Sequence, residues 1–323
     1  MRDTLNLVRG AVSTKDLLPV LTHFHIYEGR VQGGNGRIAI DAPCPELAGF
    51  DCTVPAERFL KAVDACDGEP KLKLTDGGKL TVSKGKFRAT LPLAKHEDFP
   101  RTAEVPKVNS FLDSVKLPAL LPLLRGLYPF LGEDASRAWS CGAFLNGGYA
   151  WATNNVALAR KPCPVFQNTV LPIFAIDELL RIGQEPTSIQ SDENALWFYF
   201  EGGWWMRCQK LAGEWPDVAK FMPAEPPACG TPAAALREAV RKVLPFCPDP
   251  KYPVVQTGPD GVGTLEGEMS AMVGAEGLPT GRFRAEPLLA VLDAAEAIDL
   301  STYPGACYWR GQGIDGVIVG LRI

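Results

Sequence analysis

Three histidines and one glycine-rich segment are the residues of this sequence whose types could support metal binding or phosphate chemistry. His23 and His25 are two residues apart, so on a strand both side chains would lie on one face. A His-x-His pair can bind a metal, but no Asp, Glu or Cys grouping nearby completes a set of ligands, and His96 falls in an expected loop. We therefore predict ordinary strand histidines and no metal site.

The segment Gly33-Gly34-Asn35-Gly36 lacks the Lys-Ser/Thr pair of a phosphate-binding loop and lies between two short expected strands. It is therefore predicted to be a hairpin turn. The sequence has no Gly-x-Ser-x-Gly element of a serine hydrolase, and its carboxylates cannot be paired in space from their order along the chain. We predict no catalytic residue and no cofactor, and hence a protein that is not an enzyme.

Acidic residues outnumber basic ones in this chain. Its 33 Lys and Arg and 37 Asp and Glu give a net charge of -4 and a pI of about 5.6. A protein that simply coats DNA is usually basic overall. If this chain contacts DNA, its positive charge must therefore be confined to one surface, and the acidic remainder would oppose non-specific adhesion.

Nine cysteines are scattered singly without a Cys-x-x-Cys pair, which is typical of reduced thiols in a cytoplasmic protein. No run approaches the roughly 20 apolar residues of a membrane helix, and the N-terminal residues, which include Asp3, do not resemble a signal peptide. The sequence predicts a cytoplasmic protein without a membrane partner. Its 323 residues suit two or three domains.

The elements that would position functional residues recur three times along the chain. An amphipathic helix with a proline or an acid near its start is predicted at 54–63, 174–182 and 283–292. Short strands that alternate apolar and polar residues follow the first two, with hairpin turns at Asp76-Gly77-Gly78 and Glu201-Gly202-Gly203. The third repeat also ends in alternating strands.

Two of the repeats close on similar turns, Glu97-Asp98-Phe99-Pro100 and Gly213-Glu214-Trp215-Pro216-Asp217, and a linker follows each turn. These linkers are plausible domain boundaries. We predict an α+β protein of three repeated domains, at 1-106, 107-224 and 225-323. Each domain is expected to be an antiparallel sheet with two helices packed on one face.

The first helices of the repeats differ in how clearly the sequence predicts them. In the third repeat, Arg237 and Arg241 are spaced i, i+4 and share a face. The residues expected to face the sheet there are Leu236, Ala239, Val240 and Val243. In the second repeat, Pro118 and Pro122 argue against a regular helix, because an interior proline removes a helix hydrogen bond.

Six short segments, spread over the whole chain, carry a resemblance to a known family. They are Leu18-Pro19-Val20-Leu21, Val54-Pro55-Ala56, Leu91-Pro92 with Glu97-Asp98-Phe99-Pro100, Ala152-Thr153-Asn154-Asn155-Val156-Ala157-Leu158-Ala159, Gly213-Glu214-Trp215-Pro216-Asp217 and Val319-Gly320-Leu321-Arg322-Ile323. In this order they resemble the bacterial-type DNA polymerase sliding clamp, the beta subunit of the replicative polymerase. Asn154 stands where the family has an acid, and Val156-Ala157 replaces a His-Arg pair, which indicates a divergent member.

The resemblance implies a DNA clamp fold in which two chains join head to tail as a homodimer and close a ring around duplex DNA. It implies a DNA polymerase and a clamp loader as partners. A surface that slides needs attraction to phosphates without base readout. The residues assigned to DNA contact are Lys15, Arg58, Lys61, Arg125, Arg137, Trp139, Arg181, Arg237, Arg241 and Lys242.

The resemblance also implies an apolar pocket between domains two and three that captures a short peptide of the polymerase or the clamp loader. Its expected walls are Thr153, Asn155, Val156, Leu158, Pro216, Lys220, Phe221, Val317, Ile318, Val319, Gly320, Leu321 and Arg322. The last strand can serve both the pocket and the core, because alternate residues of a strand point to opposite faces.

Two other classes of protein remain open from the sequence. One is a repeated α+β module that binds a protein or a small ligand and does not encircle DNA. The other is an uncharacterised hydrolase. Retention on circular but not on linear DNA would identify a ring, and turnover of a substrate would identify an enzyme.

Overall fold

The computed structural model describes residues 1–15, 18–102, 119–146, 148–163, 168–211, 213–267, 269–271 and 278–322. The chain divides into two compact units. Unit 1 is Met1–Leu117 with Asp177–Lys210, and unit 2 is Pro118–Ile176 with Leu211–Ile323. Helix α4 (Ile173–Ile182) is divided between them after Ile176. The division into three domains stays a prediction.

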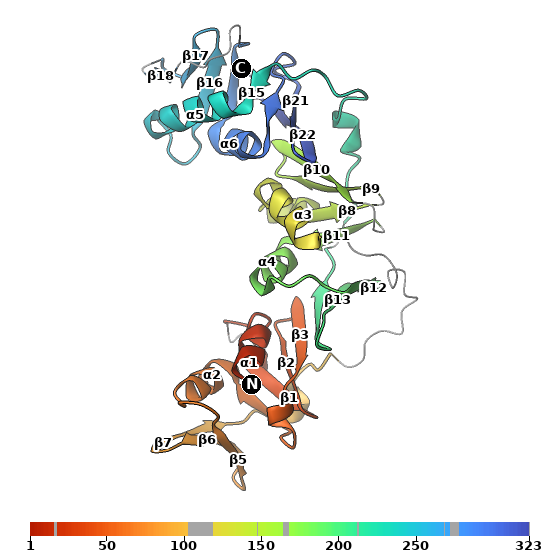
Figure 1. Cartoon of the computed structure of the whole chain (residues 1–323), viewed down its shortest axis with the longest axis vertical. Coiled ribbons are helices and arrows are strands. Elements are labelled where there is room, and N and C mark those ends of the chain that lie inside the picture. The colour runs from red at the N-terminus through yellow and green to blue at the C-terminus, as the bar shows by residue number, and fades with distance from the viewer. Residues whose placement is uncertain are drawn as a thin grey trace. The chain divides into compact units, whose positions relative to one another are not determined.

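Unit 1 combines antiparallel sheets with helices that pack against them (Figure 1). Among its described residues, a seven-stranded sheet has the order β12 (Ser188–Ser191), β13 (Ala195–Tyr199), β14 (Trp205–Gln209), β3 (Ile38–Pro43), β2 (Arg30–Gly34), β1 (His23–Tyr27) and β4 (Cys52–Pro55). A three-stranded sheet has the order β5 (Lys71–Thr75), β6 (Lys79–Lys84) and β7 (Phe87–Pro92). The helices are α1 (Arg2–Arg9) and α2 (Ala56–Asp64), with the second part of α4.

Helix α2 shows why the sequence folds as it does here. It begins directly after Pro55, and Glu57 lies in its first turn, where a negative charge complements the helix N-terminus. Phe59, Leu60 and Val63 are almost completely buried. Each such side chain stabilises the fold by roughly 1.5–3 kcal/mol relative to an exposed one.

Unit 2 has the same construction. Its described residues form an eight-stranded sheet in the order β11 (Thr169–Pro172), β8 (Gly142–Leu145), β9 (Gly148–Thr153), β10 (Ala157–Cys163), β22 (Ile314–Val319), β21 (Ala306–Gly311), β20 (Ala297–Ile298) and β15 (Thr231–Pro232). A four-stranded sheet has the order β18 (Ser270–Ala271), β17 (Gly261–Thr264), β16 (Val254–Gly258) and β19 (Gly281–Arg284). Helices α3 (Leu120–Leu127), α5 (Ala233–Val243) and α6 (Ala285–Ala294) accompany them, as do the 3-10 helices η5 (Ala135–Ser140) and η6 (Ala219–Phe221).

The sequence argued against a regular first helix in the second repeat. This prediction was wrong, because α3 is a regular helix. Pro122 lies in its first turn, where a backbone N–H has no partner inside the helix in any case. The missing N–H of proline therefore costs little at this position. Pro118 lies outside the described residues.

The two large sheets join strands from consecutive repeats. In unit 1, β14 pairs with β3, with Trp205 opposite Asp41. In unit 2, β10 pairs with β22, with Leu158 opposite Val317. The predicted α+β class with antiparallel sheets is confirmed, and the described residues include two helices for each predicted domain. The residues of α5 expected to face the core are buried: Leu236, Ala239, Val240 and Val243.

Candidate functional site

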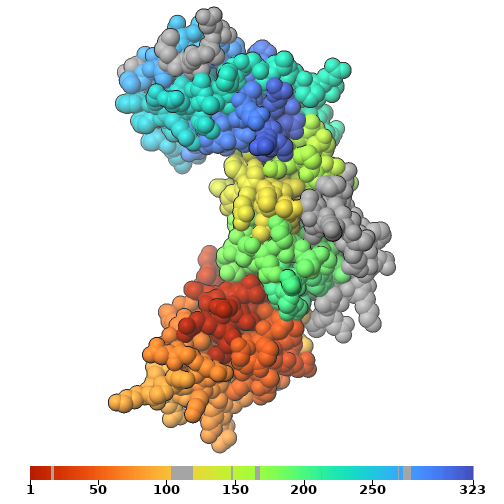
Figure 2. Space-filling model, viewed as in Figure 1, coloured from red at the N-terminus to blue at the C-terminus, as the bar shows by residue number. Residues whose placement is uncertain are grey.

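A cavity of about 370 Å³ opens on one face of the eight-stranded sheet of unit 2. Thr153 on β9 pairs with Leu158 on β10, and Leu158 pairs with Val317 on β22. The pair of Val319 and Ala306 extends this floor to β21. Because cross-strand partners share a face, the strands present one continuous and mostly apolar surface. In Figure 2 the blue surface of β21 and β22 adjoins the yellow-green surface of β8 to β10.

The turn between β9 and β10 is fixed by its own side chains. The side-chain oxygen of Asn154 accepts hydrogen bonds from the backbone N–H of Val156 at 3.1 Å and of Ala157 at 2.8 Å. The hydroxyl of Thr153 donates to the carbonyl of Ala157 at 2.8 Å. Asn155 has a φ of 70°, a left-handed conformation that asparagine adopts more readily than most residues. The two asparagines therefore hold the edge of the pocket in a defined shape.

Two aromatic side chains, Trp139 and Phe221, line the pocket. Trp139 of η5 meets Trp215 edge-on, with ring centroids 5.4 Å apart, and Trp215 stacks on Phe144 at 5.1 Å. Phe221 of η6 is 53% exposed although it is a large apolar side chain. An exposed apolar wall beside an apolar floor, with a few polar groups at the rim, is typical of a site that binds a hydrophobic segment.

Most residues predicted for the pocket line it. They are Thr153, Asn155, Val156, Leu158, Pro216, Lys220, Phe221, Val317 and Val319. Ile318 does not, because it points to the opposite face, where it is fully buried between its strand partners Ala157 and Cys307. Residues 320–322 follow β22 and do not contribute to the lining; the N–H of Leu321 instead donates to the carbonyl of Arg282 at 2.8 Å. The role of the lining residues stays a prediction.

Several lining residues were not assigned to the pocket from the sequence. Ala157, Asp217, Val218 and Ala306 were missed, and Arg137 and Trp139, predicted for DNA contact, also line the pocket. Asp217 and Val218 adjoin Pro216, so extending that predicted segment would have found them. Ala306 has no local signal, because only its pairing with Val319 brings it to this face.

The cations of α5 that were predicted to contact DNA are engaged by carboxylates. Arg237 and Arg241 both reach Asp293 of α6, at 3.7 and 2.7 Å. Lys242 pairs with Glu238 on its own helix at 2.7 Å. These pairs are largely exposed, so each contributes little to stability. They nevertheless offset much of the positive charge of this helix.

The remaining helix and loop cations are exposed. Lys61 of α2 pairs with Glu57 at 3.2 Å. Lys15, Arg58 and Arg125 form no ion pair within the described parts of the chain. The structure therefore leaves these three side chains available to an external anion.

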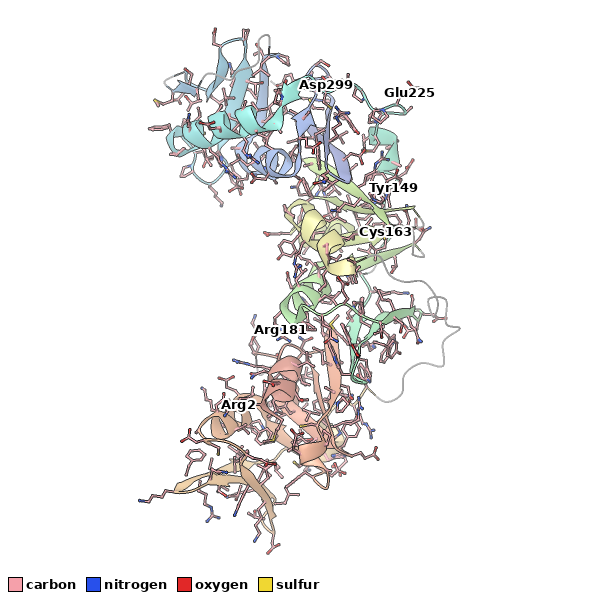
Figure 3. The ribbon with its side chains drawn as sticks, in the orientation of Figure 1. Arg2, Tyr149, Cys163, Arg181, Glu225 and Asp299 are labelled. Carbon is pink, nitrogen blue, oxygen red and sulfur yellow. The ribbon has the colours of Figure 1, made fainter. Side chains whose placement is uncertain are left out.

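Arg181 is engaged by neighbouring residues of unit 1, although its side chain is 44% exposed (Figure 3). Its guanidinium donates to Glu178 at 2.8 Å and to the carbonyl of Leu7 at 2.7 Å, near the C-terminal end of α1. Hydrogen bonding to the Glu178 carboxylate raises the pKa of Arg181. A Cβ on Gly10 would overlap the carboxylate of Glu178, so a larger residue there would displace the Glu178–Arg181 pair. Arg181 thus caps α1 with a favourable charge.

Of the three histidines only His25 is buried in the interior of unit 1, whereas His23 is half-buried and His96 is exposed. His25 is 1% exposed and stacks between Tyr27, with ring centroids 5.1 Å apart, and Phe99, at 4.9 Å. His96 lies against it at 4.4 Å. Burial lowers the pKa of His25 to about 4. Within the described residues, no three His, Cys, Asp or Glu side chains are arranged to hold a metal ion.

Comparison with known proteins places the fold. No family model and no curated protein matches this sequence. Among solved structures, the chain is similar over 100% of its length to 97% of the DNA polymerase III subunit beta from Pseudomonas aeruginosa, with 21% identity and a TM-score of 0.79. The same coverage holds for the DNA polymerase sliding clamp from Bacillus subtilis, at 15% identity and a TM-score of 0.81.

A third similar structure contains a bound peptide. It is the Helicobacter pylori beta clamp bound to a DNA ligase peptide, which is similar over 100% of this chain and 97% of its own, with 14% identity and a TM-score of 0.80. Similarity over the full length cannot arise from one shared supersecondary unit. The chain therefore has the fold of the bacterial DNA polymerase sliding clamps.

Proposed function

We propose that this protein is a sliding clamp, a non-enzymatic processivity factor that encircles duplex DNA and tethers a DNA polymerase to it. The observation that carries the proposal is the full-length similarity to bacterial clamps at TM-scores near 0.8. The pocket on the eight-stranded sheet supports it, because a tether also needs a site that holds a partner. The similarity spans the whole chain, and the pocket lies on unit 2.

The ring is proposed to form from two chains joined head to tail. Each unit has strands at the edges of its smaller sheet, such as β5 and β7 in unit 1 and β18 in unit 2. An unpaired edge strand is a template for pairing with another chain. A head-to-tail contact whose rotation closes makes a ring instead of a fibre. Topological linkage then retains the protein on DNA without tight contacts.

Contact with DNA is proposed to be electrostatic and independent of sequence. Arg58, Lys61, Arg125 and the basic residues of α5 supply exposed positive charge on helices. Several of these charges are already shared with carboxylates, as described for Asp293. Weak attraction of this kind suits sliding, because a clamp that gripped each phosphate tightly would be slowed.

The pocket is proposed to bind a short hydrophobic peptide of a DNA polymerase or a clamp loader. Its floor of Leu158, Val317 and Val319 and its wall of Phe221 offer apolar contacts, and Lys220 and Asp217 supply polar groups at the rim. The H. pylori clamp, which shares the fold, holds a DNA ligase peptide. Peptide anchors in such pockets contribute most of the binding energy.

A cytoplasmic location accompanies this proposal. None of the helices in the described parts of the chain is long and apolar enough to cross a membrane. All nine cysteines are free, and most are buried. Free thiols of this kind suit a reducing compartment.

Retention on nicked circular DNA, with a competent loader, tests the proposal. The expected result is that the protein stays on the circle through gel filtration and is lost after the circle is cut to a linear form. A DNA-independent check that the loader turns over ATP accompanies each trial. Equal, salt-sensitive retention on both forms would show ordinary electrostatic attachment and would favour a binding module that does not encircle DNA.

A further inference from the structure

A short segment after β7 crosses the face of the seven-stranded sheet that lies opposite α1. A Cβ on Gly33 would lie 2.9 Å from Val8 of α1, so Gly33 faces the helix and its neighbour Gln32 faces away from it. His25 pairs with Gln32 and therefore shares its face. Residues 96–102, which we call the strap, contact this face and belong to unit 1.

The C-terminal part of the strap is held by polar contacts. The N–H of Thr102 donates to the side-chain oxygen of Gln32 at 2.9 Å, and the side-chain amide of Gln32 donates to the carbonyl of Thr102 at 3.3 Å. The guanidinium of Arg101 lies 4.0 Å from the centroid of the Tyr27 ring. Contacts of these kinds are individually weak. The firmest attachment is therefore expected where rings of the strap meet the sheet.

That attachment is centred on His25. Phe99 is 5% exposed and stacks on the His25 ring, and the ring of His96 lies 4.4 Å from it, centroid to centroid. Nδ1 of His25 lies 3.2 Å from the hydroxyl oxygen of Thr53, whereas its Nε2 is buried and has no hydrogen-bond partner in the described structure. A protonated imidazole carries an N–H on both nitrogens. Protonation of the closed form would therefore leave one buried N–H without an acceptor.

The charges around His25 also oppose its protonation. Burial is the largest of the causes that lower its pKa to about 4, and the charges of His96 and Arg101 on the strap follow. Asp51 and Asp41 raise this pKa without offsetting the other three causes. Release of the strap would return the ring to water, where its ordinary pKa is 6.5. The released form therefore binds a proton more tightly than the closed form.

The two facing carboxylates compensate little. The side chain of Asp51 is 69% exposed, so water screens its charge, and it lies 3.1 Å from Nδ1 of His96. Asp41 is fully buried and already accepts hydrogen bonds from three side chains, those of Tyr27, Arg30 and Gln32. Neither carboxylate accepts a hydrogen bond from His25 in the described structure.

We propose that the strap is an acid-sensitive latch: a proton bound by His25 releases residues 96–102 from the sheet while the sheet itself stays folded. The closed form loses stability as the pH drops from 6.5 toward 4, because the released form binds more protons in this window. The sheet is retained because its other face forms a separate core with α1, which includes the fully buried side chains of Ile26, Val31 and Ile40. The latch operates without DNA and without a second chain.

Hydrogen–deuterium exchange of the whole chain, corrected for the pH dependence of the intrinsic exchange rate, tests the latch. Thr102 reports on the strap, because its N–H bonds to Gln32 only in the closed form, and the amides of β1 and β2 report on the sheet. From pH 7 to pH 4.5 we expect protection at Thr102 to fall by roughly fiftyfold, as a pKa of about 4 in the closed form and 6.5 in the released form requires. Protection in β1 and β2 should change much less. A parallel loss in the sheet, or constant protection at Thr102, would overturn the proposal.

His25→Phe keeps an aromatic ring against Phe99 but cannot bind a proton, so protection of its strap should be nearly equal at the two pH values. The matched control is His23→Phe, the same substitution two residues away on β1, where Nδ1 lies 2.8 Å from the carbonyl oxygen of Pro19. This control should keep the fall seen in the unchanged protein. An equal fall in His25→Phe would show that other groups release the strap. Thermal unfolding at pH 8 checks that both variants fold, and the comparison of strap and sheet in the unchanged protein needs no variant.

Discussion

Phe221 exposes about half of its surface on the wall of the pocket, next to Lys220, whose ammonium lies 5.4 Å from its ring. If the pocket binds a hydrophobic peptide, this ring loses its contact with water on binding. We predict that Phe221→Ala weakens peptide binding by about tenfold, corresponding to the 1–2 kcal/mol that an apolar anchor contributes. Isothermal titration with a clamp-binding peptide measures the change.

The chain provides a matched control for this prediction in Phe246. It is 54% exposed in the same unit but does not line the pocket. Phe246→Ala should leave peptide affinity unchanged. If both variants bind the peptide as the unchanged protein does, the peptide does not use this wall.

Arg181 leads to a prediction about stability rather than about DNA. Arg181→Ala removes the charge that caps α1 and leaves the nearly buried carboxylate of Glu178 without its partner. We expect the free energy of unfolding to fall by about 1–3 kcal/mol, measured by urea denaturation. Affinity for a short duplex should stay within twofold of the original value. Unchanged stability with weakened DNA binding would support the DNA contact that the sequence predicts for Arg181.

At the scale of single residues, the sequence predicted which segments lie near the pocket better than it predicted which face of a strand each side chain points to. The alternation along 317–321 correctly left room for both a pocket and a core, yet it could not show that Ile318 faces Ala157 in the interior. Trp139, predicted to contact DNA, packs on Trp215 beside the pocket, and its contact with DNA stays a prediction. Such choices depend on the register between distant strands, which no local pattern encodes.

The segment after β7 packs on β1 through a titratable residue. The rings of His96 and Phe99 lie against His25. Burial, followed by the nearby charges of His96 and Arg101, lowers the pKa of His25 in the folded protein to about 4. Asp51 and Asp41 act in the opposite direction and raise it. The ordinary pKa is 6.5. Between pH 6.5 and 4 the unfolded chain therefore binds more protons than the folded chain, so the free energy of unfolding falls as the pH drops through this window.

Replacement of the titrating ring separates this effect from general acid denaturation. A phenylalanine at this position can keep the stacking on Tyr27 and Phe99 but cannot bind a proton. We predict that His25→Phe gives a shallower dependence of the urea midpoint on pH between 6.5 and 4. The two proteins should be compared at pH 8 to show that the variant folds. Parallel pH curves would assign the acid sensitivity to other groups.

At the scale of elements, local signals predicted the second helix of each repeat and the hairpin turns. They failed for α3, because the distance of Pro122 from the start of the helix could not be judged before the start was known. An interior proline breaks a helix, whereas one in the first turn is tolerated. Helix boundaries therefore decided this case, and they are the least certain part of a sequence-based prediction.

For the molecule as a whole, the balance of charge between α5 and α6 predicts how firmly DNA is held. Asp293 engages both Arg237 and Arg241. If α5 contacts DNA, Asp293→Asn should raise the affinity for a short duplex by about threefold to tenfold. The change frees two guanidinium groups and removes one negative charge from the protein. Fluorescence anisotropy at low salt measures this change.

Glu286→Gln is the control for this change. It removes the same charge from an exposed position on the same helix but engages neither arginine. A smaller gain in affinity is expected from it. Equal gains would show that only net charge matters, and no gain from either variant would place DNA elsewhere.

The repeats in the sequence predicted the fold class, but they could not predict which strands share a sheet. Strand pairs joined by a hairpin, such as β5 and β6, follow from a two-residue period and a turn. The sequence predicted both the alternating strands and the turn. The pairing of β14 with β3 joins residues more than 160 positions apart, and it depends on the complete fold. For the same reason the pocket floor, which needs β10 beside β22, came from a family resemblance and not from any pattern in the residues.

Unit 1 is assembled from two stretches of chain that are far apart in sequence, and β14 joins them by pairing with β3. Each stretch alone exposes a long edge of the seven-stranded sheet. A fragment ending at Thr102 and a second fragment beginning at Ala119 should therefore find each other in solution and co-purify when they are produced as separate polypeptides. The two fragments would then act as a split reporter, in which association of the fragments completes one β-sheet and produces the signal.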